Sequence, residues 1–270
     1  MSTMIRMPAV AGHFYPGKPA QLAHDIESYT ISDEEKISAI GCIVPHAGYM
    51  YSGHVAGAVY ARLKLPRRFI ILCPNHTGMG APLAIMSAGE WLTPLGKVRI
   101  DAELAELLKR NYERLSEDTA AQLCEHAIEV QLPFLQKLLP SFTFVPITVG
   151  ASRYELLEDL GRAIAAILGE IDGHVLLIAS SDMNHYESDE ITRTKDRRAL
   201  DAIVSLDSRR LYGVVTRQNV SMCGFGPAIA MLTAAKLRGA TRAELIKYAT
   251  SGDISGDRDA VVGYAGVAVV

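Results

Sequence analysis

Short apolar segments alternate with longer amphipathic segments along most of the chain. This pattern is typical of strands that alternate with helices around a parallel or mixed sheet. Most of the apolar segments contain no polar alternation, as strands that are covered on both faces must be. The predicted strands are Ile40–Pro45, Phe69–Pro74, Phe142–Val149, Val175–Ser180 and Val261–Val270.

Amphipathic segments between these strands predict the helices. In the second of them Leu104, Leu107 and Leu108 recur at helical spacing, and Asp101 is placed to cap the helix. The predicted helices are Gly53–Leu63, Asp101–Asn111, Ala127–Leu138, Arg153–Leu168, Ile191–Ser205, Ser208–Thr216 and Pro227–Leu237. No Pro-, Gly- or Ser-rich linker divides the chain, so we expect one α/β domain over residues 1–270.

Composition excludes several classes of protein. The 270 residues are 49% hydrophobic and 21% charged, which is unlike disordered, collagenous or coiled-coil chains. The 27 basic and 30 acidic residues are interspersed, so we expect no nucleic-acid surface. No apolar run approaches the roughly 18 residues of a membrane helix, and the N-terminus lacks the apolar centre of a signal peptide. The four cysteines form no C-x-x-C pair, which favours a reducing cytoplasm.

Polar residues follow three of the apolar runs at the point where each run ends. His46 follows the first strand, His76 follows the second, and Asp182 and His185 follow the run that ends at Ser180. Side chains just past the carboxyl ends of neighbouring strands converge on one crevice in an open α/β sheet. We therefore expect these four residues to share a pocket.

One cysteine has a different setting from the others. Cys223 precedes Gly224, Gly226 and Pro227 and then the start of an apolar helix, and the positive end of a helix dipole favours the thiolate. Cys42 and Cys73 lie within predicted strands and are interpreted as core residues. The sequence around Cys124 is compatible with a core cysteine and with a functional one.

Two further segments contain candidate pocket residues. In CEHAIEVQLPFLQ, His126 stands at the start of a predicted helix, and Glu129 lies one turn further on, where it could orient the histidine. Glu125 and Glu129 could equally be ordinary helix charges. His13, in AGHFYPG, could reach the same pocket. The chain lacks the H-E-x-x-H, G-x-S-x-G and Walker motifs, so the signature motifs of three common enzyme classes are absent from the sequence.

Six blocks in a fixed order carry a resemblance to a known family. They are PAVAGHFYP, PHAGYMYSGHVAGAVY, PNHTG, EHAIEVQLPFLQ, SSDMNHY and MCGFGPA. Together they resemble the Memo family, whose bacterial and archaeal members are called AmmeMemoRadiSam system protein B. The resemblance covers nearly the whole chain.

The resemblance implies a three-layer α/β/α fold similar to class III extradiol dioxygenases, which hold Fe(II) with two histidines and a glutamate. His46 and His76 match the two histidine ligands, and His185 falls where an acid/base histidine would sit. Cys223 occupies the place of the third ligand, as in other Memo proteins. Cysteine in place of the glutamate departs from the dioxygenase pattern. Because a thiolate is a softer ligand than a carboxylate, copper and zinc become candidate metals beside iron.

Three hypotheses follow for the function. The leading one is a cytosolic protein that binds a transition metal, with iron expected, through His46, His76 and Cys223, while Asp182 and His185 move protons for a redox or oxygen-dependent reaction. The second is a non-catalytic module that binds a protein or peptide in the same cleft. The third is a zinc-dependent hydrolase. The substrate class would be a small molecule or peptide, and the family name implies a pathway link to a radical-SAM protein.

Overall fold

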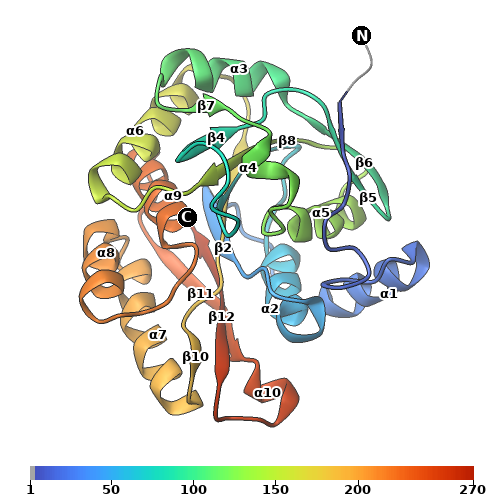
Figure 1. Ribbon diagram of the computed structural model, residues 1–270, viewed down its shortest axis with the longest axis vertical. Helices are drawn as coiled ribbons and strands as arrows, with labels where there is room; N and C mark the ends of the chain where they lie inside the picture. Colours follow the sequence, from blue (N-terminus) through green and yellow to red (C-terminus); the bar gives the residue numbers. More distant parts are fainter. Residues whose placement is uncertain (1–3) are drawn as a thin grey trace.

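A mostly parallel sheet forms the centre of the protein in a computed structural model, which describes residues 4–270 (Figure 1). The parallel centre follows the strand order β6-β8-β3-β9-β2. These strands are β6 (Gly96–Ile100), β8 (Thr143–Val149), β3 (Arg68–Pro74), β9 (Val175–Ser180) and β2 (Gly41–Val44). Because they run in one direction, their carboxyl ends lie at one edge of the sheet.

Further strands, most of them paired antiparallel, extend the sheet on both sides; the pairs β1–β5 and β4–β7 are parallel. On the β2 side, β12 pairs with β2, β11 and β10, and on the other side β5 pairs with β6 and β1. A short β4 pairs with β8 and with β7. These strands are β12 (Val261–Val269), β11 (Ala243–Thr250), β10 (His185–Glu187), β5 (Glu90–Thr93), β1 (Ile5–Arg6), β4 (Leu83–Ile85) and β7 (Ser116–Glu117).

Helices cover both faces of the sheet (Figure 1). One layer contains α1 (Pro19–Tyr29), α2 (Tyr49–Arg62) and α5 (Leu132–Leu138), and the other contains α3 (Ala102–Asn111), α6 (Tyr154–Glu170), α7 (Asp189–Val204), α8 (Ser208–Arg217) and α9 (Phe225–Leu237). Shorter helical turns are α4 (Ala120–Leu123), α10 (Gly252–Ser255) and the 3₁₀ turn Glu129–Gln131. The predicted α/β fold with a mostly parallel central sheet between helical layers is confirmed.

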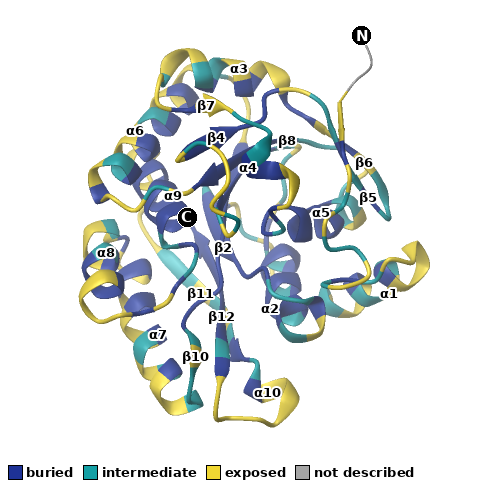
Figure 2. Cartoon of the chain, in the orientation of Figure 1, coloured by how far each residue is buried: buried dark blue, intermediate teal, exposed yellow. Residues whose placement is uncertain are grey.

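Burial explains why the central strands were recognisable. All residues of β2 and β9 are buried, and β3 and β8 are buried except at their first residues (Figure 2). Strands covered on both faces must be apolar throughout. Cys42 and Cys73 lie in this core, as the sequence predicted.

Several predicted boundaries differ from the structure. The prediction of one helix over Ala127–Leu138 is wrong at its start, because a 3₁₀ turn at Glu129–Gln131 precedes α5. The helix predicted from Gly53 begins four residues earlier, at Tyr49. The pattern missed α1 and the partly exposed β11, since neither contains a long apolar run. Among residues 4–270 no helix is long and apolar enough to cross a membrane.

Candidate metal centre

His46 lies two residues beyond the end of β2, and its side chain is buried. Its backbone N–H donates to Asp182 Oδ1 at 2.8 Å, which ties the end of β2 to the segment after β9. Burial lowers the pKa of His46 well below its ordinary value, and the neighbouring histidines His126, His76 and His185 lower it further. The imidazole is therefore neutral, which is the form that binds a metal.

The hydrogen bonds around Ser180 decide which nitrogen of His46 carries the proton. The Ser180 hydroxyl donates to the Ala127 carbonyl at 2.7 Å and accepts from Gln131 Nε2 at 2.9 Å. A hydroxyl has a single hydrogen, so the contact of 3.0 Å with His46 Nδ1 requires that Nδ1–H donates to Ser180. The lone pair of His46 is consequently on Nε2, which lies 3.2 Å from Cys223 Sγ.

His76 lies two residues beyond β3 and is held by Glu125. Its Nδ1–H donates to Glu125 Oε1 at 2.9 Å, and its backbone N–H donates to Oε2 at 2.7 Å. Burial lowers the pKa of His76, but the hydrogen bond and the charge of Glu125 outweigh burial and raise it. This arrangement leaves Nε2 of His76 as the nitrogen for a ligand and fixes the ring, as carboxylates commonly do for metal-binding histidines.

Cys223 directly precedes Gly224, the N-cap residue of α9. A side chain at Gly224 would collide with the carbonyl oxygen of Ser180 and the side chain of Ser181, so glycine is required for this close approach. Burial raises the pKa of the Cys223 thiol, and the carboxylate of Asp182 raises it further. The predicted preference for thiolate at the helix start is therefore wrong for the protein without a cation, which would have to supply the missing positive charge.

Ligand atoms of His46, His76 and Cys223 all lie within 4.8 Å of one another, although the residues come from three separate segments of the chain. The donor set fits a metal ion: two imidazoles whose Nδ1 atoms are already engaged, and one sulfur. Ligands at 2.0 to 2.3 Å from a zinc-like ion stand about 3 to 4 Å apart, and the 3.2 Å between Cys223 Sγ and His46 Nε2 falls in that range. Thiolate and imidazole suit iron, copper and zinc better than magnesium or calcium.

Asp182 and His185 follow β9 beside this group. Asp182 is buried, and burial raises its pKa to about 6 although the N–H of His46 and the charge of His185 lower it. His185 is half-buried, and both its backbone N–H and its Nδ1 contact Ser221, at 2.8 and 3.0 Å. The next residue, Tyr186, is 78% exposed and has a positive φ of 60°, an unusual backbone conformation that often marks functional loops.

Of the remaining predicted pocket residues, His126 lies in the site, whereas Glu129 and His13 do not. His126 belongs to the group: its ring is stacked on His76 with centroids 4.7 Å apart, and its Nδ1 lies 3.5 Å from Glu125 Oε1. Of the two readings of Glu129, the one in which it orients the ring of His126 is wrong, because the hydrogen bonds of Glu129 within residues 4–270 go to the N-terminal segment. His13 is exposed and lines a separate hollow with Tyr15, while its neighbour Phe14 packs on His126.

Buried charges behind the site were not predicted. Arg6, in β1, forms an ion pair with Glu129, and both side chains are fully buried. Arg6 also donates to the carbonyls of Gln122 and Glu125, so the N-terminal strand holds the loop that carries Glu125 and His126. The sequence distance of 119 residues between Arg6 and Glu125 hides this contact from any local pattern.

The fold and this group of residues define an α/β protein with two histidines and one cysteine gathered at the carboxyl edge of a mostly parallel sheet. The profile of the family described as "Memo-like protein" matches residues 6–268. The chain belongs to the Memo family.

Relatives from archaea support this assignment. A MEMO1 family protein of Methanothermobacter thermautotrophicus is 43% identical over 97% of this chain and 99% of its own length. MEMO1 family proteins of Methanosarcina mazei and Methanocaldococcus jannaschii are also 43% identical, each over 98% of this chain and 99% of their own lengths. The crystal structure of an uncharacterized protein from Escherichia coli K12 has a similar fold, with a TM-score of 0.54 and 13% identity over 83% of this chain and 98% of that one.

Proposed function

We propose that this protein binds a transition metal, with iron as the expected ion, through His46, His76 and Cys223, and that it performs a redox or oxygen-dependent reaction on a small molecule or peptide. The observation that carries the proposal is the convergence of the three ligand atoms within 4.8 Å of one another. When bound, such a metal supplies a redox couple and Lewis acidity at the carboxyl edge of the sheet.

The surrounding hydrogen bonds support a prepared ligand set. Ser180 fixes the proton of His46 on Nδ1, and Glu125 does the same for His76, so both Nε2 atoms have a lone pair for a metal. Both supporting residues are fully buried, which holds the imidazole rings in place before any ligand arrives. Outer partners of this kind typically contribute about 10- to 100-fold to metal affinity.

Two residues beside the ligands suit proton transfer. Asp182 has a pKa of about 6, close to neutral pH, so it can accept and release a proton under ordinary conditions. His185 is half-buried, contacts Ser221 through Nδ1, and would offer Nε2 to a bound substrate. We assign Asp182 to the inner part of the site and His185 to its open face.

The test is purification under anaerobic conditions, followed by elemental analysis and measurement of oxygen uptake. Cys223→Ser is expected to lose soft-metal stoichiometry, because a neutral hydroxyl is a poor donor. His185→Ala is expected to retain the metal and to lower any oxygen-dependent activity by about 10²- to 10⁴-fold, as is typical for the loss of a general acid or base. Cys124→Ser, at an exposed cysteine, is the matched control.

The outcomes separate the alternatives. Stoichiometric zinc without oxygen uptake would replace the redox function with a hydrolase. Wild-type protein that takes up none of iron, copper and zinc would refute the metal centre and favour the binding module. Equal metal loss in His185→Ala and Cys223→Ser would add His185 to the ligands.

A further inference from the structure

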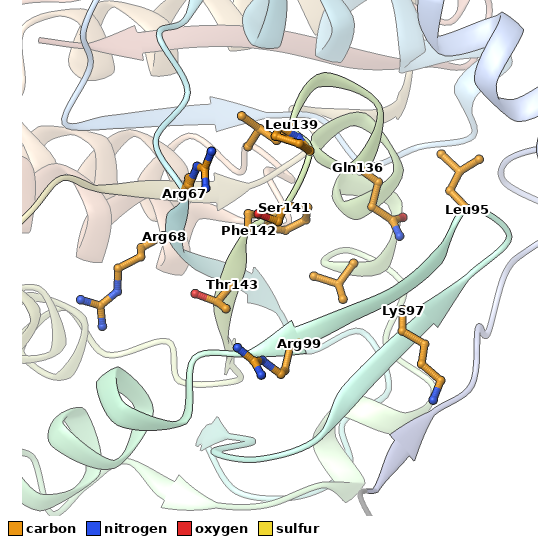
Figure 3. A pocket seen from close by; sticks show the side chains of 12 residues that line it. Arg67, Arg68, Leu95, Lys97, Arg99, Gln136, Leu139, Ser141, Phe142 and Thr143 are labelled. Carbon is orange, nitrogen blue, oxygen red and sulfur yellow. The ribbon is translucent and has the colours of Figure 1, made fainter.

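A cavity of about 570 Å³ lies at the opposite end of the central strands from the metal centre (Figure 3). Its lining includes Arg67 and Arg68 at the start of β3 and Thr143 at the start of β8, whereas His76 follows the other end of β3. A strand of seven residues spans roughly 23 Å. The cavity is therefore separate from the metal centre.

Four cationic side chains surround this cavity. Figure 3 shows Arg68 and Arg99 on one flank beside Thr143, with Arg67 and Lys97 on two other sides. Arg68 pairs with Asp101 at 2.7 Å, and Lys97 pairs with Glu90 at 3.1 Å.

Two of these cations have no partner among residues 4–270. Over residues 4–270, the side chains of Arg67 and Arg99 form no ion pair and no hydrogen bond, and both residues are exposed. The whole chain has a net charge of −3, so this excess of positive charge is a local feature and not the average of the surface. Guanidinium groups with all their donors available are well suited to phosphate, which they can bind through two parallel hydrogen bonds.

The rest of the lining is mixed: Ser141 and Thr143 stand beside apolar side chains, and the hydroxyl of Thr143 is already engaged with Asp101. Leu95, Val98, Leu139 and Phe142 contribute apolar surface, and Gln136 is already engaged with Thr93 and the carbonyl of Gly96. The volume lies within the range of about 300 to 1,000 Å³ that is usual for small-molecule sites. A ligand that matches both parts has an apolar or aromatic portion and more than one negative charge.

We propose that this cavity binds a phosphorylated small molecule of about the size of a nucleoside diphosphate, with its phosphates at Arg99 on the flank of Arg68 and Thr143, its apolar portion against Leu139 and Phe142, and Arg67 contacting it from another side. Because the site is remote from His46, His76 and Cys223, the inference is independent of the proposed metal-dependent function. Binding there adds a second ligand to the protein and requires no metal.

The test uses adenosine diphosphate as the probe, with the full-length protein and isothermal titration calorimetry. Wild-type protein is expected to bind saturably, and the affinity is expected to fall as salt screens the charges. Arg99→Gln and Arg67→Gln are each expected to weaken binding by about tenfold or more, the usual effect of losing one charge-assisted hydrogen bond. Neither arginine has a partner to lose in the part of the chain that the structure describes, so both variants should keep the wild-type melting temperature.

Three controls locate the binding. Arg217→Gln removes an exposed arginine from the end of α8 and should leave the affinity unchanged. Cys223→Ser should also bind normally, which distinguishes the cavity from phosphate binding at the metal centre. Pyrophosphate should compete with the nucleotide, whereas adenosine without phosphates should bind much more weakly.

Specific results would overturn the inference. They are the absence of saturable binding at millimolar nucleotide, equal affinities in wild type and both cavity variants, or equal weakening in Arg217→Gln. Adenosine that binds as tightly as its diphosphate would remove the role of the arginines. Loss of binding in Cys223→Ser alone would move the ligand to the metal centre.

Discussion

Glu125→Gln is the most informative single change, because it preserves the shape of a buried side chain while it removes the charge and replaces one acceptor oxygen with a donor. One carboxylate oxygen of Glu125 accepts from His76 Nδ1 and from the N–H of Ala127, each at 2.9 Å. The other oxygen accepts from the backbone N–H of His76 at 2.7 Å. Burial raises the pKa of Glu125, but these hydrogen bonds outweigh burial and hold it below its ordinary value, so the group is charged.

The geometry sets the size of the effect. The amide of glutamine has one oxygen and one NH₂ group, so whichever way it is oriented an N–H of residue 76 or 127 faces another donor. At least one hydrogen bond to a charged group is lost, which costs about 1.5 to 3 kcal/mol of unfolding free energy. The ring of His76 also loses its orienting partner, and metal affinity should fall by about 10- to 100-fold.

The assay is titration of the metal-free protein with Co²⁺, whose absorption reports thiolate ligation, in competition with a chelator. Unfolding of the metal-free protein in urea measures the loss of unfolding free energy separately. Leu104→Ala is the matched control, because deleting this buried side chain in α3 should cost about 2 to 5 kcal/mol without contacting the centre.

Two results would refute the reasoning. One is wild-type cobalt affinity in Glu125→Gln. The other is an equal loss of affinity in Leu104→Ala, which would assign the effect to general destabilisation and not to the orientation of His76.

Three further predictions concern other buried groups. Ser180→Ala should lower cobalt affinity by about 10- to 100-fold, because Nδ1 of His46 loses its acceptor; unchanged affinity would contradict the assigned tautomer. Burial raises the pKa of Asp196 to about 6. The ionisation of Asp196 therefore lowers the stability of the wild-type protein as pH rises from about 4 to 6. Urea unfolding of Asp196→Asn should therefore show stability rising relative to wild type across that window, and a constant difference would exclude the shift. A bulky thiol reagent should modify exposed Cys124 first and the buried Cys42 and Cys73 only on unfolding; rapid labelling of Cys42 or Cys73 in the folded protein would contradict this order.

The sequence by itself determined the central strands and the residues that follow them. The strand predicted at Val175–Ser180 has the observed bounds, and that at Phe69–Pro74 differs by one residue. Burial on both faces leaves a continuous apolar run, which is a local signal that needs no knowledge of neighbours. The carboxyl-edge rule then places His46 and His76 together, because parallel strands end at one edge.

Tertiary structure decided what holds those residues. Glu125 could be read as an ordinary helix charge, and its role depends on the position of a loop that Arg6 fixes from the far end of the chain. Ser180 ends an apolar strand, and only its contacts with Ala127 and Gln131 make it the residue that sets the tautomer of His46.

The same limit explains the errors. Helix position alone favoured a thiolate at Cys223, but burial and the nearby Asp182 raise the pKa of the thiol, and neither is visible in the local sequence. The helical spacing of His126 and Glu129 suggested a contact, whereas the buried Arg6 draws Glu129 to the N-terminal segment. Periodicity reports which face of an element is buried, and the partner of each buried charge is fixed only when distant segments pack together.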